Sequence, residues 1–152
     1  MRVTIDAPAD SATPALVVSR IIAASPEVLF DAWTDPRSLA AWMQPGDATL
    51  TEVSADARVG GEFSILMHMP GSPVLHRGTY LEVDRPRRLV FTWRSRFTDD
   101  DDTVVTVDFR VTDAGTEVAV THERLPHDAA RAAHDAGWTD CLTELAAWVG
   151  RD

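Results

Sequence analysis

Histidine and carboxylate side chains are frequent in the last third of the sequence, where they could bind a metal ion or catalyse proton transfer. His122, Glu123 and His127 fall within the stretch HERLPH. Their spacing matches neither the H-x-x-x-H pattern of a metal-binding helix nor a carboxylate-flanked triad. His134 has an ordinary pKa suited to acid–base catalysis, but it lies alone on an apolar helix face. We therefore predict that His134 contacts a ligand, with catalysis as the alternative, and we expect no metal site.

Three other stretches carry residues of chemical interest without the spacing that the chemistry needs. The acidic run at 99–102 lacks the glycine and glutamate of a calcium loop, so it is interpreted as a hairpin loop. RVGGE at 58–62 precedes a strand rather than a helix and is interpreted as a turn, not a phosphate loop. Cys141 lies in the middle of a helix on its apolar stripe, where a cysteine acts as a small hydrophobic residue with a raised pKa. No nucleophile and no cofactor are predicted.

Hydrophobic periodicity indicates the elements that must position these residues. An apolar, β-branched strand is predicted at 15–23, followed by a helix that starts at Ser25 and Pro26. Asp35 and Pro36 end that helix and begin a second short one. From there to about residue 123 the period is close to two, which predicts five further strands and another at 48–54.

One face of the predicted antiparallel sheet is apolar and aromatic, and the other is polar. Such a sheet needs a cover on its apolar side. The remaining long element is a helix from about Pro126 to Val149, so the sequence predicts an α+β domain in which this helix lies across the sheet. The apolar sheet face comprises Phe63, Ile65, Met67, Met69, Leu89, Phe91, Trp93, Val105, Val107, Phe109 and Val111. The helix stripe comprises Ala130, His134, Gly137, Trp138, Cys141, Leu142, Leu145 and Val149.

Gly137 weakens this helix on the face that should be packed. A glycine costs about 0.8–1 kcal/mol of helix propensity relative to alanine, so a gain should offset it. One interpretation is that Gly137 lets the helix approach the sheet closely beside Trp138. The other is that small side chains leave a void that a small molecule can occupy. The stretch 129–137 holds five alanines and one glycine, which favours the void.

Composition limits the class of protein. The chain has 152 residues, 45% of them hydrophobic, and a net charge of −10. We predict one domain at 15–150 after a flexible lead-in at 1–14. The acidic balance argues against nucleic acid and anionic membrane surfaces as partners, and neither a signal peptide nor a membrane-inserted segment is predicted. With a single cysteine, a cytoplasmic protein is predicted.

Five stretches in order carry a resemblance to a known family: SPEVLFDAWTDPRSLAAWMQP, ARVGGEF, HRGTYLEVDRPRRLVFTW, GTEVAVTHE and HDAGWTDCLTEL. Together they resemble the activator of heat-shock-protein-90 ATPase homologue family, within the START-like (SRPBCC, Bet v 1-like) superfamily. The resemblance implies a helix-grip fold, a curved antiparallel sheet wrapped around a long C-terminal helix with two short helices after the first strand. It also implies a cavity between sheet and helix.

The resemblance also implies which side chains line that cavity and what occupies it. The expected occupant is a small hydrophobic molecule, aromatic or lipid-like. The polar groups expected inside are Tyr80 and His134, with Thr79 or Arg77 beside them. Together with Gly137, the ligand-binding residues implied are Trp42, Phe63, Ile65, Met67, Tyr80, Phe91, Trp93, Phe109, His134, Trp138 and Leu142.

Two other functions stay open from the sequence. A cyclase, dehydratase or hydrolase could use the same cavity, and Tyr80 and His134 converging inside it would favour that alternative. A protein-interaction or co-chaperone-like role would require an exposed apolar patch. Only about fourteen residues precede the first strand, where the eukaryotic co-chaperone carries a further domain, so chaperone activation is not expected from the resemblance alone. The sequence does not decide between a monomer and a homodimer.

Overall fold

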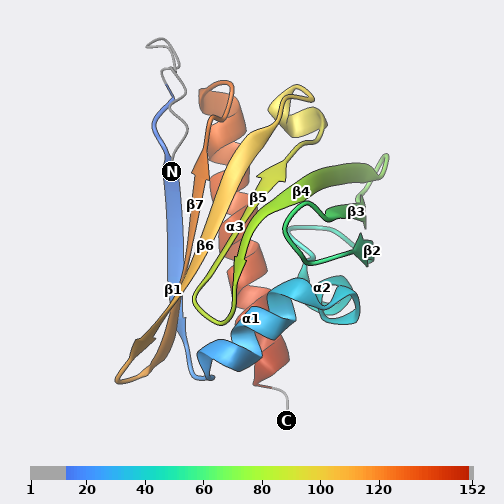
Figure 1. Cartoon of the computed structure of the whole chain (residues 1–152). Helices are drawn as coiled ribbons and strands as arrows, with labels where there is room; N and C mark the ends of the chain where they lie inside the picture. The colour runs from blue at the N-terminus through green and yellow to red at the C-terminus, as the bar shows by residue number, and fades with distance from the viewer. Residues whose placement is uncertain (1–12, 151–152) are drawn as a thin grey trace.

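A curved antiparallel sheet and three α-helices form the structure, a computed structural model that describes residues 13–150 (Figure 1). The predicted lead-in lies outside the described residues except for its last two positions. The helices are α1 (Pro26–Thr34), α2 (Pro36–Trp42) and α3 (Asp128–Val149), with a 3₁₀ turn η1 (Arg96–Thr98). The strands are β1 (Leu16–Ile22), β2 (Leu50–Ala55), β3 (Glu62–His68), β4 (Val74–Asp84), β5 (Arg88–Trp93), β6 (Thr103–Thr112) and β7 (Gly115–Glu123).

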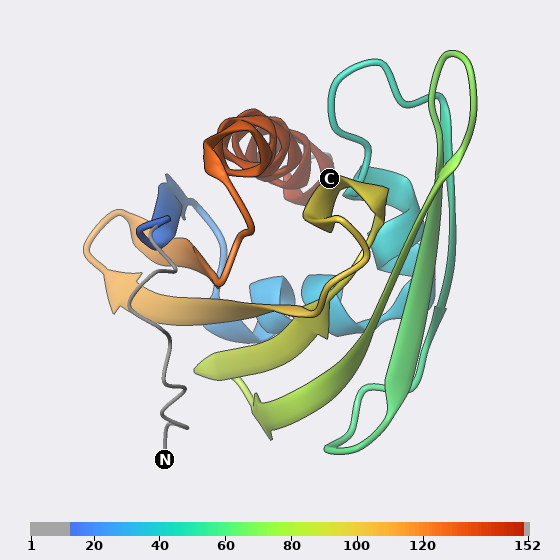
Figure 2. The same ribbon diagram turned by 90° about the horizontal axis from the view of Figure 1, so that it is seen from above.

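The sheet has seven strands in the order β1-β7-β6-β5-β4-β3-β2. Strands β2 to β7 pair with their neighbours in the chain, whereas β1 joins β7, with Leu16 opposite His122. Seen from above, the strands curve around α3, which is viewed along its axis (Figure 2). The predicted helix-grip α+β fold is confirmed, including the strand predicted at 48–54.

Side-chain caps fix where the helices begin. The Ser25 hydroxyl accepts a hydrogen bond from the Val28 amide, and the Asp35 carboxylate accepts one from Ser38, each followed by proline at the first helical position. Helix α3 begins two residues later than Pro126 because His127 serves as its cap, with Nδ1 accepting from the Ala130 amide at 3.1 Å. Among the described residues, no helix has the length and apolar character to cross a membrane.

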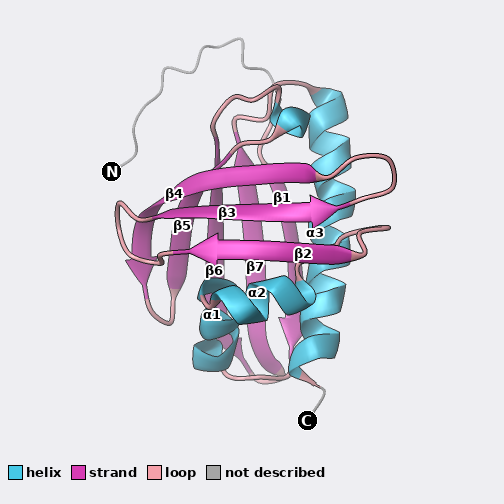
Figure 3. Cartoon of the chain, turned by 90° about the vertical axis from the view of Figure 1, so that its right-hand side faces the viewer, coloured by secondary structure: helices cyan, strands magenta, loops and turns pink. Residues whose placement is uncertain are grey.

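The apolar face of the sheet packs against all three helices. Helices α1 and α2 lie together beside β2 at one end, and α3 runs along the sheet (Figure 3). Trp33 of α1 packs edge-on against Trp42 of α2, with ring centroids 4.8 Å apart. The predicted alternation holds along β3 and β5. Val111 is an exception, 67% exposed beside the β6–β7 turn, because the helical cover ends before the strand does.

Candidate functional site

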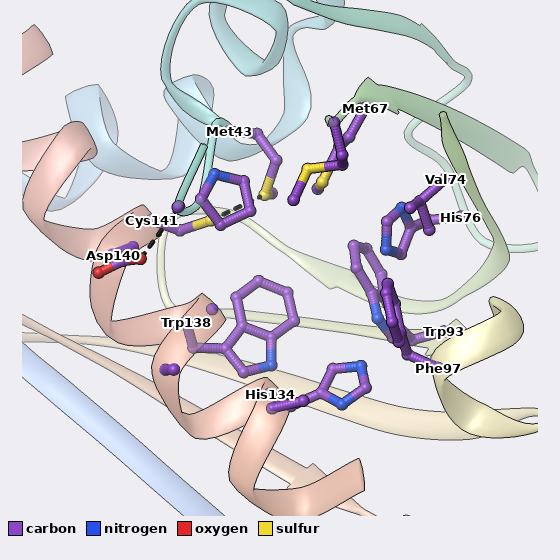
Figure 4. A pocket seen from close by; sticks show the side chains of 16 residues that line it. Met43, Met67, Val74, His76, Trp93, Phe97, His134, Trp138, Asp140 and Cys141 are labelled. Atoms are coloured by element: carbon purple, nitrogen blue, oxygen red, sulfur yellow. Dashed lines mark hydrogen bonds between the residues drawn. The ribbon is translucent and has the colours of Figure 1, made fainter. Parts of the chain in front are cut away.

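A cavity of about 250 Å³ lies between α3 and the concave face of the sheet (Figure 4). Its walls come from the connection after α2, from the β3–β4 hairpin, from β5, from η1 and from the middle of α3. Three methionines and three large aromatic side chains give the lining a mainly apolar character. The lining residues are Met43, Pro45, Gly46, Met67, Met69, Val74, His76, Trp93, Phe97, Ala133, His134, Ala136, Gly137, Trp138, Asp140 and Cys141.

Gly137 borders open space. A Cβ atom placed on Gly137 would meet no atom of another part of the chain within 4 Å. The interpretation of Gly137 as a close contact between helix and sheet is therefore wrong. The glycine in a close contact is Gly78 of β4, and that contact lies within the sheet, since a Cβ there would collide with the Thr92 carbonyl oxygen of β5 and the Phe63 ring of β3.

His134 presents a hydrogen-bond acceptor to the cavity. Its Nδ1 lies 2.8 Å from the Ala130 carbonyl oxygen, and because a carbonyl only accepts, Nδ1 must carry the hydrogen. Burial lowers the pKa of His134, which favours the neutral ring. In a neutral imidazole with a protonated Nδ1, Nε2 keeps its lone pair.

His76 provides a second neutral ring. Its Nδ1 lies 3.4 Å from the Ile65 carbonyl oxygen, and the ring stacks on Trp93 with centroids 4.6 Å apart. Burial lowers the pKa of His76 to about 4, with smaller contributions from His134 and Arg96. His76 was not predicted as a cavity residue, although it shares a strand face with Val74 and Tyr80, and that alternation is the signal that identifies it.

His122 belongs to a buried hydrogen-bond network rather than to a metal site. The Trp138 indole N–H donates to His122 Nδ1 at 3.0 Å, so Nε2 carries the hydrogen and donates to the Thr103 hydroxyl at 2.7 Å. Thr103 in turn donates to the Trp93 carbonyl oxygen at 2.6 Å. Burial lowers the pKa of His122 to about 2. Within residues 13–150, no three His, Cys, Asp or Glu side chains form a group able to hold a metal ion.

The structure divides the predicted ligand-binding residues into two sets. Met67, Trp93, His134, Gly137 and Trp138 line the cavity. A second set lies in the core outside it, comprising Trp42, Phe63, Ile65, Tyr80, Phe91, Phe109 and Leu142.

The second set is separated from the cavity because α1, α2 and the C-terminal half of α3 pack against the part of the sheet on which these residues lie. Phe63, Ile65, Tyr80 and Phe91 surround only a gap of about 10 Å³, and Phe109 packs on Phe30 with centroids 5.4 Å apart. Burial raises the pKa of Tyr80 to about 12. Tyr80 and His134 do not border the same space.

Several lining residues were missed because they lie outside regular elements. Pro45 and Gly46 follow α2, and the Gly46 amide donates to the Asp140 carboxylate of α3 at 3.0 Å. Phe97 comes from η1, within a connection predicted as a plain loop. Cys141, in contrast, lies on α3 and was predicted to be buried. Its Sγ lies 3.5 Å from Met43 Sδ, and burial raises the pKa of its thiol.

Comparison with known proteins identifies the family. A model of the family described as Activator of Hsp90 ATPase homolog 1-like protein matches residues 23–150. The chain belongs to this family. The family resemblance predicted from the sequence is thus confirmed. No curated protein matches the sequence.

Solved structures of bacterial family members and related proteins share the fold. A Rhodobacter sphaeroides protein superposes with a TM-score of 0.80 at 24% identity, over 90% of this chain and 92% of that one. The AHSA1 protein of Silicibacter pomeroyi gives 0.77 at 25% identity, over 91% and 99%. A Chromobacterium violaceum protein gives 0.75 at 26% identity, over 90% and 97%. The helix-grip architecture is therefore common to this group.

Proposed function

We propose that this family member binds a compact hydrophobic small molecule in the cavity between α3 and the sheet. The open space beside Gly137 carries this proposal. A helix gains from alanine over glycine at an interior position, and nothing in the fold requires a glycine there. Retaining the space is the gain that offsets the weaker helix.

The lining supports a hydrophobic occupant. Met43, Met67 and Met69 face the space together with Trp93 and Trp138. Thioethers are flexible and polarisable, and they make favourable contacts with aromatic rings. A molecule with an aromatic ring would therefore find complementary surfaces on several sides.

The size of the cavity favours a small occupant. Ligand sites usually have volumes of roughly 300–1,000 Å³, and this one, at about 250 Å³, lies just below that range. A one- or two-ring aromatic molecule suits the space better than a long-chain lipid.

The two alternative functions gain less from the described residues. The enzyme alternative depended on Tyr80 and His134 meeting in one cavity, and they border different spaces. The interaction alternative needs a contiguous apolar patch. The exposed large apolar residues are instead distributed over β1, α1, β2, β4, η1, β6 and the turn before β3.

Substitution of Gly137 tests the proposal with naphthalene as a neutral aromatic probe. We expect Gly137→Leu to lower naphthalene affinity at least about tenfold, equivalent to about 1.4 kcal/mol, because the leucine side chain would occupy the open space. Gly137→Ala adds only a methyl group to this space, so it should lower the affinity less than Gly137→Leu does and raise the free energy of unfolding by about 0.8–1 kcal/mol. Isothermal titration calorimetry and urea denaturation measure the two effects.

Ala132→Leu is the matched control, since Ala132 is an exposed residue of α3 outside the lining. It should leave naphthalene affinity unchanged. Absence of naphthalene binding to the unmodified protein, or equal affinity in the unmodified protein and Gly137→Leu, would show that the proposed site is wrong.

A further inference from the structure

The cavity wall contains a hydrogen-bond donor that the fold leaves unused. Trp93 lines the cavity and is 3% exposed, and its indole Nε1–H has no hydrogen-bond partner among the described residues. Burying a donor without an acceptor is unfavourable. The indole donors of Trp42 and Trp138 are both paired, with the Ala32 carbonyl oxygen and with His122.

Trp33 is the useful comparison. Its Nε1–H is also buried without a partner among the described residues, but it borders only the gap of about 10 Å³. A gap of that size holds no ligand. Trp93 borders the same gap but also lines the cavity of about 250 Å³, where a ligand has room to supply the missing acceptor.

An acceptor lies on the same cavity. With Nδ1 committed to the Ala130 carbonyl oxygen, His134 offers its Nε2 lone pair. In Figure 4 the free ring nitrogen of His134 is directed toward the side on which Trp93 and Phe97 lie. The cavity lining therefore includes the unused Trp93 donor and the His134 acceptor on walls that are otherwise mainly apolar.

The charges around the cavity oppose an anionic ligand. No arginine is among the described residues that line it, and the one charged lining residue is Asp140. Arg96 lies close enough to affect His76, but its guanidinium donates to the Ser72 hydroxyl and lies over the Phe97 ring. A carboxylate in this space would lose hydration without gaining a cationic partner.

These observations lead to the chemical class of the ligand, an inference that rests on the proposed function. We infer that the bound molecule is an uncharged aromatic alcohol, a phenol in the simplest case. Its oxygen accepts a hydrogen bond from Trp93 Nε1–H, and its hydroxyl donates a hydrogen bond to His134 Nε2. A hydroxyl group combines one donor with acceptor lone pairs, which matches the Trp93 donor and the His134 acceptor. A methyl ether retains the acceptor but loses the donor.

A probe series that keeps the ring system constant tests this inference on the unmodified protein. The probes are naphthol, methoxynaphthalene, naphthalene and naphthoate, titrated by calorimetry at neutral pH. Naphthol should bind about tenfold more tightly than naphthalene, as expected when neutral hydrogen bonds are added. Methoxynaphthalene, which keeps only the bond from Trp93, should have an intermediate affinity. Naphthoate should bind most weakly.

Equal affinities for naphthol and naphthalene would overturn this inference and leave the proposed function standing. Tighter binding of naphthoate than of naphthol would also overturn it. Absence of binding by every probe would instead overturn the proposed function, and this inference with it.

Two matched substitutions locate the effect. Trp93→Phe removes the unused donor and keeps an aromatic ring, so the ratio of naphthol to naphthalene affinity should fall by about threefold to tenfold. Trp33→Phe removes the other unpartnered indole donor, away from the cavity, and should leave the ratio unchanged. A ratio that responds equally to both substitutions would contradict the assignment of Trp93, and thermal unfolding checks that each variant is folded.

Discussion

Trp138, His122 and Thr103 form a chain of hydrogen bonds that ends on the main chain of Trp93. These hydrogen bonds join α3 to β7, β6 and β5 behind the cavity wall. Each donor among them has an acceptor, which fixes His122 as the neutral tautomer with hydrogen on Nε2. The indole ring of Trp138 is thereby held in place as a wall of the cavity.

Thr103→Val tests the contribution of this chain. The substitution keeps the side-chain shape but leaves His122 Nε2–H without its acceptor, so we expect the free energy of unfolding to fall by about 1–3 kcal/mol. Urea denaturation measures the loss. Thr106→Val on the same strand is the control, because the buried Thr106 hydroxyl makes no hydrogen bond to another described residue, and its effect should stay within about 0.5 kcal/mol. Similar losses in both variants would contradict the role assigned to Thr103.

The five cavity residues that were predicted from the sequence all lie on regular elements. His134 and Gly137 were predicted because their types conflict with a packed helix stripe. Met67 and Trp93 were predicted because strand alternation places them on the apolar face of the sheet, where the family resemblance implies a cavity. Pro45, Gly46 and Phe97 were not predicted, since irregular connections have no periodicity to indicate which side chains face inward. The same alternation overestimated the lining, because it shows which face of a strand is buried but not what covers it.

At the scale of elements, α3 has two different halves. Its C-terminal half packs through Leu142 and Leu145, both buried, whereas its N-terminal half carries alanines and Gly137 along the cavity. Periodicity and caps predicted the helices and strands within about two residues, because those signals are local. The turn η1 was not predicted because its capping by Ser95 and Thr98 involves too few residues to give a pattern.

The connection between α2 and β2 contacts α3 through a hydrogen bond from the Gly46 amide to the Asp140 carboxylate, and through the Met43 and Cys141 sulfurs. Asp140→Ala removes the hydrogen bond at an exposed site, so the free energy of unfolding should change by less than about 1.5 kcal/mol. The connection would then open more often, and the dissociation rate of naphthalene should rise several-fold in stopped-flow fluorescence. Asp135→Ala, at an exposed residue of α3 outside the lining, should leave that rate unchanged. An unaltered rate in Asp140→Ala would show that the hydrogen bond does not control access.

For the molecule as a whole, three buried histidines make stability depend on pH. The pKa values of His76, His122 and His134 are all lowered, chiefly by burial, to about 4 for His76 and about 2 for His122. Unfolded histidine has a pKa near 6.5. As the pH falls below that value, the unfolded chain binds protons that the folded chain excludes, so the folded state loses stability.

We therefore expect the free energy of unfolding to fall between pH 7 and pH 5, each histidine contributing up to about 1.4 kcal/mol per pH unit at the lower end. Urea denaturation across this range measures the slope. The lowered pKa of Asp31, caused by its hydrogen bonds to Arg85, affects stability only below about pH 4. His76→Gln should make the slope shallower, because one titrating group is removed. If His76→Gln left the pH dependence of the free energy of unfolding unchanged, His76 would not contribute to it as expected.

The position of β1 at the edge of the sheet has a consequence for the order of folding during synthesis. Strands β2 to β7 can each pair with the strand made just before or just after, but Leu16 needs His122 as its neighbour. On a ribosome, β1 therefore emerges long before β7, the strand with which it pairs among the described residues, and it stays unpaired while most of the domain is translated. Its exposed Val17 and Ile21 side chains belong to a segment that a nascent-chain chaperone could occupy until β7 and α3 leave the exit tunnel.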